Sequence, residues 1–176
     1  MHRRAFVQGL AWLAAAGPAR AQGFAGLGGE AEGYAPVVRG RALTFPADHG
    51  AHPQFRIEWW YVTANLRGED GEAYGVQWTL FRQAMAPGSE GQGWGSRQLW
   101  MGHAAVTSAR QHLFAERLAR GGVGQAGVEA APFHAFIDAW ELRAPEGASA
   151  QTLAPLALKA SSTDFRIDLR LDTTRP

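Results

Sequence analysis

The sequence predicts an all-β, antiparallel fold, and three observations support this. Residues 165–172 alternate apolar and charged side chains without a fault, which is typical of a strand with one buried face and one solvated face. The turn-rich hexapeptide 67–72 separates two strand-like runs, 55–66 and 73–83, and so predicts a hairpin. No long segment has helical periodicity.

The remaining strands are predicted from the same period-two pattern. We expect them at 37–44, 98–107, 135–142 and 154–160. Residues 112–119 fit either a strand or one to two turns of helix. Stretches rich in Gly, Pro and Ser predict loops at 86–96, 121–132 and 144–151. Seven or eight strands without a long helix indicate an antiparallel sandwich or barrel.

Composition bounds the class of protein. The chain has 176 residues, of which 46% are hydrophobic and 19% charged, so it is long enough for one domain with a core and is not a disordered chain. Seven Trp and nine Phe suggest a wide apolar interior, and a β-barrel can enclose an apolar ligand. The absence of Cys excludes disulfides, thiolate metal sites and a Cys nucleophile.

The first 21 residues are predicted to be a signal peptide. Paired Arg3 and Arg4 precede an apolar run to about Ala16, and cleavage is expected after Ala21. The pair resembles a twin-arginine signal, although His2 leaves the general secretory route open. We therefore expect a periplasmic or secreted protein, with a flexible lead-in over 22–36 and a single domain over 37–176.

The net charge argues against nucleic acid as a partner. The whole chain has 17 basic and 16 acidic residues, and the predicted signal peptide carries three of the arginines. The remaining 14 basic and 16 acidic residues give a charge of −2, so no strongly basic surface is expected.

The stretch from Phe45 to Tyr61 carries most of the chemical information. A loop with two histidines and an aspartate leads into a predicted strand rich in charged and aromatic residues. On that strand Arg56, Glu58 and Trp60 share one face, and Ile57, Trp59 and Tyr61 share the other. Charges on a buried face must pair, because an unpaired buried charge is costly.

Three interpretations of this stretch remain open. It could be a structural network in which Asp48 and His49 close the loop and an Arg56–Glu58 pair plugs one end of a barrel. It could be a metal site built from His49, His52 and either Asp48 or His103. It could also support acid–base catalysis, if desolvation by aromatic neighbours lets Glu58 donate a proton.

Other polar side chains on later strands are candidates for a pocket. Gln77 and Arg82 lie on the strand predicted to pair with 55–66, and His103 lies on a later one. The sequence contains no Gly-x-Ser-x-Gly elbow, phosphate loop or dinucleotide fingerprint, so it does not support a serine hydrolase, a nucleotide-binding protein or a Rossmann fold, and we expect no cofactor. We also expect no resident metal, because the His-x-x-His pair lacks a third ligand of known position.

Three motifs resemble one known family. They are Phe-Pro-x-Asp-His-Gly-x-His-Pro-x-Phe-Arg-x-Glu-Trp-Trp-Tyr at 45–61, Tyr-Gly-x-Gln-x-Thr-x-Phe-Arg at 74–82 and Met-Gly-His-Ala-Ala-Val-Thr at 101–107. Together they resemble the AttH and carotenoid 1,2-hydratase family. The resemblance implies two lipocalin-like β-barrels packed together. This chain, which stops directly after a clean strand, would be the N-terminal barrel.

The resemblance also implies two different functions. Hydratases of the family add water to an isolated C=C bond of an isoprenoid. Here Glu58 or Asp48 would be the acid that protonates the C=C bond. Trp59 or Trp60 would face the carbocation that results, and His49 or His103 would position the water that attacks it. His52, Arg56, Tyr61, Gln77 and Arg82 would complete the ligand site. Other members accompany ABC-transporter permeases, which implies a non-catalytic carrier of a lipid or isoprenoid with possible peripheral membrane contact.

Overall fold

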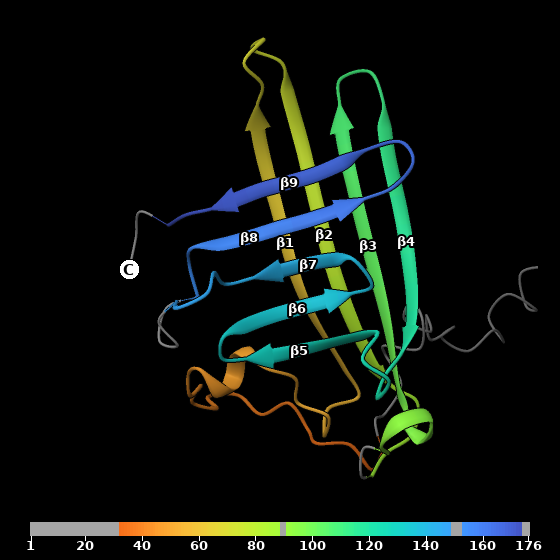
Figure 1. Cartoon of the computed structure of the whole chain (residues 1–176). Helices are drawn as coiled ribbons and strands as arrows, with labels where there is room; N and C mark the ends of the chain where they lie inside the picture. The colour runs from red at the N-terminus through yellow and green to blue at the C-terminus, as the bar shows by residue number, and fades with distance from the viewer. Residues whose placement is uncertain (1–31, 89–90, 149–152, 174–176) are drawn as a thin grey trace, which may run out of the picture. The chain divides into compact units, whose positions relative to one another are not determined.

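The computed structural model describes residues 32–88, 91–148 and 153–173, and within them the chain forms two antiparallel sheets (Figure 1). The first sheet has four long strands in sequence order, β1 (Ile57–Arg67), β2 (Ala73–Ala84), β3 (Gln98–Ser108) and β4 (His112–Arg120). The second has five shorter strands, β5 (Ala126–Ala130), β6 (Phe133–Ile137), β7 (Trp140–Arg143), β8 (Leu156–Ser161) and β9 (Arg166–Leu171). Two short 3₁₀ helices, η2 (Ala47–His49) and η3 (Gly93–Gly95), precede β1 and β3.

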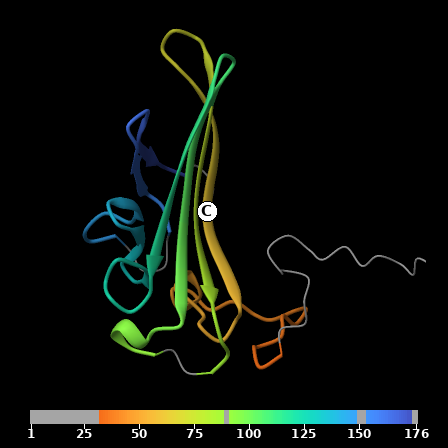
Figure 2. The ribbon, with the colours of Figure 1, turned by 90° about the vertical axis from the view of Figure 1, so that its right-hand side faces the viewer.

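The second sheet packs against one face of the first, and its strands cross those of β1–β4 (Figures 1 and 2). The inward side chains of both sheets form one apolar core. Its fully buried members include Trp78, Leu80, Ile137, Trp140 and Leu158. From Val76 onward in β2 and throughout β8, buried residues alternate with partly buried or exposed ones, as the two-residue period of a strand requires.

Gly102 on β3 allows the two sheets to approach. A Cβ atom at this position would lie 2.8 Å from Cγ2 of Ile137 and 3.3 Å from the Trp140 ring. The residue faces the turn between β6 and β7, and any larger side chain there would push the sheets apart. The glycine of the Met-Gly-His motif therefore has a packing role.

The all-β antiparallel class is confirmed, and the hairpin around 67–72 joins β1 to β2 as predicted. Residues 112–119, which fitted a strand or a helix, are in β4. The sheets do not close into one hydrogen-bonded barrel, although the arrangement is compatible with a lipocalin-like fold. Large side chains such as Trp78 and Trp140 fill the middle of the interior, which is therefore packed rather than wide.

Three element predictions are wrong. Residues 37–44 form no strand, because Val37 and Leu43 are exposed and Gly40 has a φ of +81°. The predicted strand 135–142 is two strands, since Asp138 adopts a φ of +52° in a two-residue turn between β6 and β7. The predicted loop 121–132 contains β5, which the sequence conceals among glycines and alanines.

The predicted signal peptide and most of the lead-in lie outside the described residues. The described end of the lead-in is attached to the fold: the Tyr34 hydroxyl donates to the Ala84 carbonyl at 3.0 Å, and the Ala35 amide donates to the Gln54 carbonyl at 2.9 Å. Where the chain is described, no helix combines the length and apolar character needed to cross a bilayer.

Candidate functional site

A loop ahead of β1 is folded around the carboxylate of Asp48. This carboxylate accepts hydrogen bonds from the Thr44 amide and from the Arg41 guanidinium at 2.7 Å. It also meets Nε2 of His52 at 2.7 Å. The Thr44 amide bond, followed by the His52 contact, lowers the pKa of Asp48 below its usual value. Asp48 is thus held as a carboxylate that closes the loop.

His52 lies between two carboxylates. Its Nδ1 is 2.6 Å from Oε1 of Glu58, and its Nε2 is 2.7 Å from Oδ1 of Asp48. Each ring nitrogen therefore lies within hydrogen-bond distance of a carboxylate oxygen. The backbone amide of His52 also donates to Oε2 of Glu58 at 2.7 Å. His52 therefore joins the loop to the first residues of β1.

Arg82 completes the cluster from the neighbouring strand. Glu58 and Arg82 are direct cross-strand partners, and Nε of Arg82 donates to Oε2 of Glu58 at 2.8 Å. The rest of the guanidinium donates to Oε1 of Gln98 at 2.5 Å and to the carbonyls of His52 and Phe55 at 3.0 and 2.7 Å. Its side chain is only 1% exposed. We call Asp48, His52, Glu58, Arg82 and Gln98 the ionic cluster.

The ionic cluster is well suited to fixing the loop and poorly suited to releasing a proton. Both oxygens of Glu58 are engaged in hydrogen bonds, with His52 and Arg82, and so are held within the cluster. A general acid for an alkene would instead have to carry a proton and face an apolar ligand. The pairing of Glu58 with Arg82 and the part played by Gln98 were not predicted from the sequence.

His49 is packed as an aromatic ring. It stacks on Phe45 with ring centroids 4.4 Å apart and meets the edge of Phe133 on the second sheet. Its Nε2 is buried without a hydrogen-bond partner within the described structure, and burial lowers the pKa of His49. The His49 carbonyl accepts a 3.0 Å hydrogen bond from Nε1 of Trp60. Through this bond η2 is fastened to β1.

The three adjacent aromatic residues of β1 divide between the two faces of the sheet. Trp60 points inward and stacks on Trp100 with centroids 5.9 Å apart. Trp59 and Tyr61 point outward and are 53% and 64% exposed. Arg56 lies just before β1, partly buried, and its carbonyl accepts the Ala84 amide at 2.8 Å. Trp60 therefore lies on the same face of the sheet as Glu58 of the ionic cluster, whereas Trp59 and Tyr61 lie on the opposite face.

Gln77 and His103 also lie on the outer face of the first sheet. They line a shallow hollow of about 260 Å³ with Thr79, His112 and Glu116. His103 meets the Phe81 ring edge-on, and its Nε2 is 3.6 Å from Glu116. The eleven residues predicted as one site thus occupy two places: the ionic cluster and its surroundings, and the outer face of β1–β3.

The metal interpretation is not supported by the geometry. Both ring nitrogens of His52 face carboxylates, and His103 lies on the far face of the sheet. Across the part of the chain that the structure describes, no three His, Asp or Glu side chains are grouped so as to hold a metal ion.

A further hollow, at the other end of the sheets, was not predicted. It has a volume of about 280 Å³ and lies between the far ends of β1–β3 and strand β9. Apolar side chains from both sheets line it, with Tyr74 and charged residues at its rim; the lining comprises Leu66, Arg67, Gly68, Tyr74, Val76, Val106, Arg166, Ile167, Asp168 and Leu169. We call this the open-end hollow. Tyr74 and Val106 belong to the motifs at 74–82 and 101–107, but none of the lining residues was among the predicted site residues.

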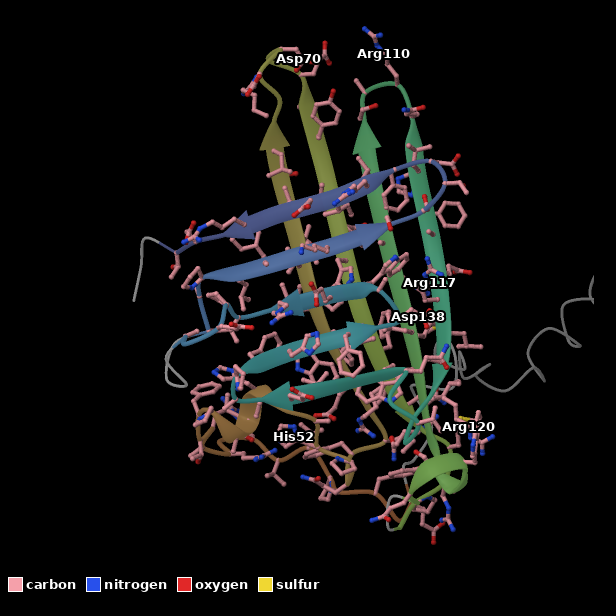
Figure 3. All side chains as sticks on the ribbon, in the orientation of Figure 1. His52, Asp70, Arg110, Arg117, Arg120 and Asp138 are labelled. Carbon is pink, nitrogen blue, oxygen red and sulfur yellow. The ribbon has the colours of Figure 1, made fainter. Side chains whose placement is uncertain are left out.

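Figure 3 shows how far apart these features lie, with His52 at one end of the first sheet and Asp70 and Arg110 at the other. Glu58 and Leu66 are eight residues apart on β1, which corresponds to about 26 Å of strand. The ionic cluster and the open-end hollow therefore occupy opposite ends of the same strands.

Comparison with known proteins places the chain in a family. A family model described as AttH-like matches residues 36–176. The crystal structure of a protein from Nitrosomonas europaea, provisionally named AttH, superposes with a TM-score of 0.62 at 30% identity, over 81% of this chain. This chain spans 41% of that protein, and no curated protein matches the sequence significantly. The chain belongs to the AttH-like family.

Proposed function

We propose that the protein binds an isoprenoid- or lipid-like molecule in the open-end hollow. The observation that supports this most directly is the lining: Leu66, Val76, Val106, Ile167 and Leu169 bring apolar side chains from two sheets around one space. Small-molecule sites are typically concave, mostly apolar and edged by a few polar groups. Tyr74 and Arg166 supply such groups at the rim.

The size of the hollow suits a short apolar ligand or one end of a long ligand. At about 280 Å³ it falls just below the usual range of roughly 300–1,000 Å³ for small-molecule pockets. We therefore expect it to hold a short apolar chain, or one end of a longer chain whose remainder stays outside. A carotenoid would be held by its terminus, which is where a hydratase would have to reach it.

Binding without chemistry is favoured over water addition. Protonation of an alkene needs an acid beside the bound ligand in a dry site. Asp48 and Glu58 lie at the other end of the strands and are engaged with Arg41, His52 and Arg82. In this proposal the ionic cluster secures the fold, and the protein acts as a carrier.

The proposed carrier works outside the cytoplasm. The N-terminal pattern at 1–21 supports export to the periplasm or beyond, where an apolar molecule needs a protein to cross water. Secretion of the full chain with cleavage after Ala21, measured by mass spectrometry of the exported protein, is the expected result. Retention of an uncleaved chain in the cytoplasm would contradict it.

The ligand proposal is tested with geranylgeraniol as the probe and Leu169→Trp as the variant. Leu169 is partly buried on the inner face of β9, so an indole there fills the hollow. We expect native mass spectrometry to show one geranylgeraniol bound to the wild-type protein and at least tenfold less on the variant. The matched control is Arg170→Trp, whose position on the same strand faces solvent.

Two outcomes would contradict the proposal. One is equal binding by Leu169→Trp and the wild-type protein, and the other is no binding by the wild-type protein. Incubation in heavy-oxygen water separates carrier from hydratase, because only a hydratase adds the label to the recovered isoprenoid. We expect no label.

A second candidate function, an accessory of an ABC-type transporter, is favoured by the outer face of the first sheet. One cross-strand row, Trp59–Phe81–Met101–Leu118, carries only apolar side chains, and Trp59 and Leu118 are more than half exposed. Exposed apolar groups of this extent on a sheet are typical of an interaction surface. Loss of permease binding in Trp59→Ser, measured with purified components, would support this role, and unchanged binding would exclude this surface.

A further inference from the structure

A separate cavity lies beside the lower ends of β3 and β4. It has a volume of about 510 Å³ and is lined by the segment after β2, the start of β3, the end of β4 and the approach to β5. Its apolar wall consists of Met85, Leu99, Leu118 and Ala119, and its polar wall of Ser96, Arg97, Gln98, Arg120 and Gln125. It lies at the opposite end of the strands from the open-end hollow. Leu99, at the start of β3, pairs with Arg120, at the end of β4, whereas the hollow is lined by Val106 near the end of β3.

The charged residues that line this cavity are all positive. The lining includes two arginines, Arg97 and Arg120, and no carboxylate. Both arginines are exposed, and Figure 3 shows Arg120 beside η3. Among the described residues, the guanidinium of Arg97 donates a hydrogen bond to the Pro87 carbonyl at 2.9 Å.

The uncharged polar groups of the lining also present hydrogen-bond donors. Arg82 donates to Oε1 of Gln98, so the remaining group of that buried amide is its NH₂. The Ser96 hydroxyl oxygen accepts the Gln98 amide at 3.3 Å, which leaves the hydroxyl hydrogen free to donate. A cavity with an apolar wall, donor groups and two guanidinium groups is complementary to an amphipathic anion.

We propose that this cavity binds an amphiphile with an anionic head group. The apolar body lies against Met85, Leu99 and Leu118, and a carboxylate or phosphate group lies at Arg97 and Arg120. This site is independent of the open-end hollow, which has an apolar interior and both signs of charge at its rim.

The test is isothermal titration of the full chain with decanoate, decyl phosphate and decanol, each below its micellar concentration. We expect both anions to bind about tenfold more tightly than the alcohol, because only they form charge-assisted hydrogen bonds. This preference should shrink as NaCl is raised from 0.05 to 0.5 M. The tighter of the two anions identifies the head group.

Arg120→Gln should remove most of the preference for the anions and leave decanol binding unchanged, whereas Arg120→Lys should retain part of it. Arg110→Gln is the matched control, because Arg110 is an exposed arginine in the hairpin turn at the other end of β3 and β4 (Figure 3). Leu169→Trp should not alter anion binding, which separates this site from the proposed carrier site.

Equal affinity for decanol and the two anions would overturn the proposal. So would unchanged anion binding by Arg120→Gln, or the absence of binding by all three probes. Because Arg120 is exposed and at the end of an edge strand, its replacement is expected to leave the thermal unfolding midpoint within about 2 °C of the wild type.

Discussion

The two ends of the first sheet are built from different chemistry. At one end a loop is attached to β1, β2 and β3 by the ionic cluster, in which a buried arginine makes four named hydrogen bonds. At the other end Leu66, Val76 and Val106 face Ile167 and Leu169 across a partly empty space. Within the ionic cluster polar side chains satisfy one another, and the cavity beside β3 and β4 adjoins the cluster at Gln98. The open-end hollow has an apolar interior and is open.

This difference separates stability from binding. A buried, satisfied network holds one arrangement of the chain, because losing any member leaves another charge unpaired. An apolar hollow imposes no such constraint and gains free energy when an apolar molecule displaces its water. The 45–61 motif therefore describes mainly the ionic cluster and its surroundings, whereas the hollow proposed for the ligand is lined by residues outside the predicted site.

The largest expected effect comes from breaking the ionic cluster with Arg82→Met. The substitution removes one of the donors to Glu58 and the Arg82 hydrogen bonds to Gln98 and to the carbonyls of His52 and Phe55. We expect the free energy of unfolding to fall by about 3–5 kcal/mol, measured by urea denaturation.

Arg170→Met is the matched control for this change, because it also removes an arginine that is paired with an acid. Arg170 binds Asp172 at 2.8 Å but is 71% exposed, so its loss should leave the free energy of unfolding close to that of the wild type. Similar losses for the two variants would contradict the role given to the ionic cluster. If Arg82→Met does not fold, Gln98→Met provides the same comparison with a smaller change.

A smaller effect on stability is expected from a change of pH, through His49 and Asp48 in the loop ahead of β1. The pKa of His49 is lowered by burial, so the folded state favours the neutral ring. The stability that this provides is complete above the ordinary value of about 6.5 and is lost as pH falls below it toward the folded-state pKa. Asp48, whose pKa is also lowered, contributes in the same direction but only below about pH 3.8.

His49→Phe isolates this contribution. Phenylalanine keeps the stacking on Phe45 and removes the titrating nitrogen, which has no hydrogen-bond partner within the described structure. Denaturation at pH 7.5 and 5.5 should show a smaller loss of stability for this variant than for the wild type. An identical loss would show that His49 does not titrate with folding.

The regular strands were predictable because their signal is local. Alternation along 73–83 and 165–172 reflects one buried face, and β2 and β9 bear this out. The turn at Asp138 and the strand β5 were missed because an Asp in the left-handed region and a run of small residues give no such signal. The expected strand at 37–44 has a suitable sequence but no partner strand in the described fold.

The site was predictable only in part. Asp48, His52 and Glu58 are close in sequence, so their association with one loop could be anticipated. The choice of Arg82 as the partner of Glu58 depends on register, which pairs residues 24 positions apart. The open-end hollow depends on how two sheets cross, and a single sequence contains no local pattern for that.

Hydrogen–deuterium exchange with and without geranylgeraniol tests the division between the two ends most directly. We predict that the ligand slows exchange of amides at 66–76, 106–108 and 166–171 and leaves those at 52–60, 82 and 98 unchanged. Protection confined to the ionic cluster, or spread equally over both ends, would contradict the account.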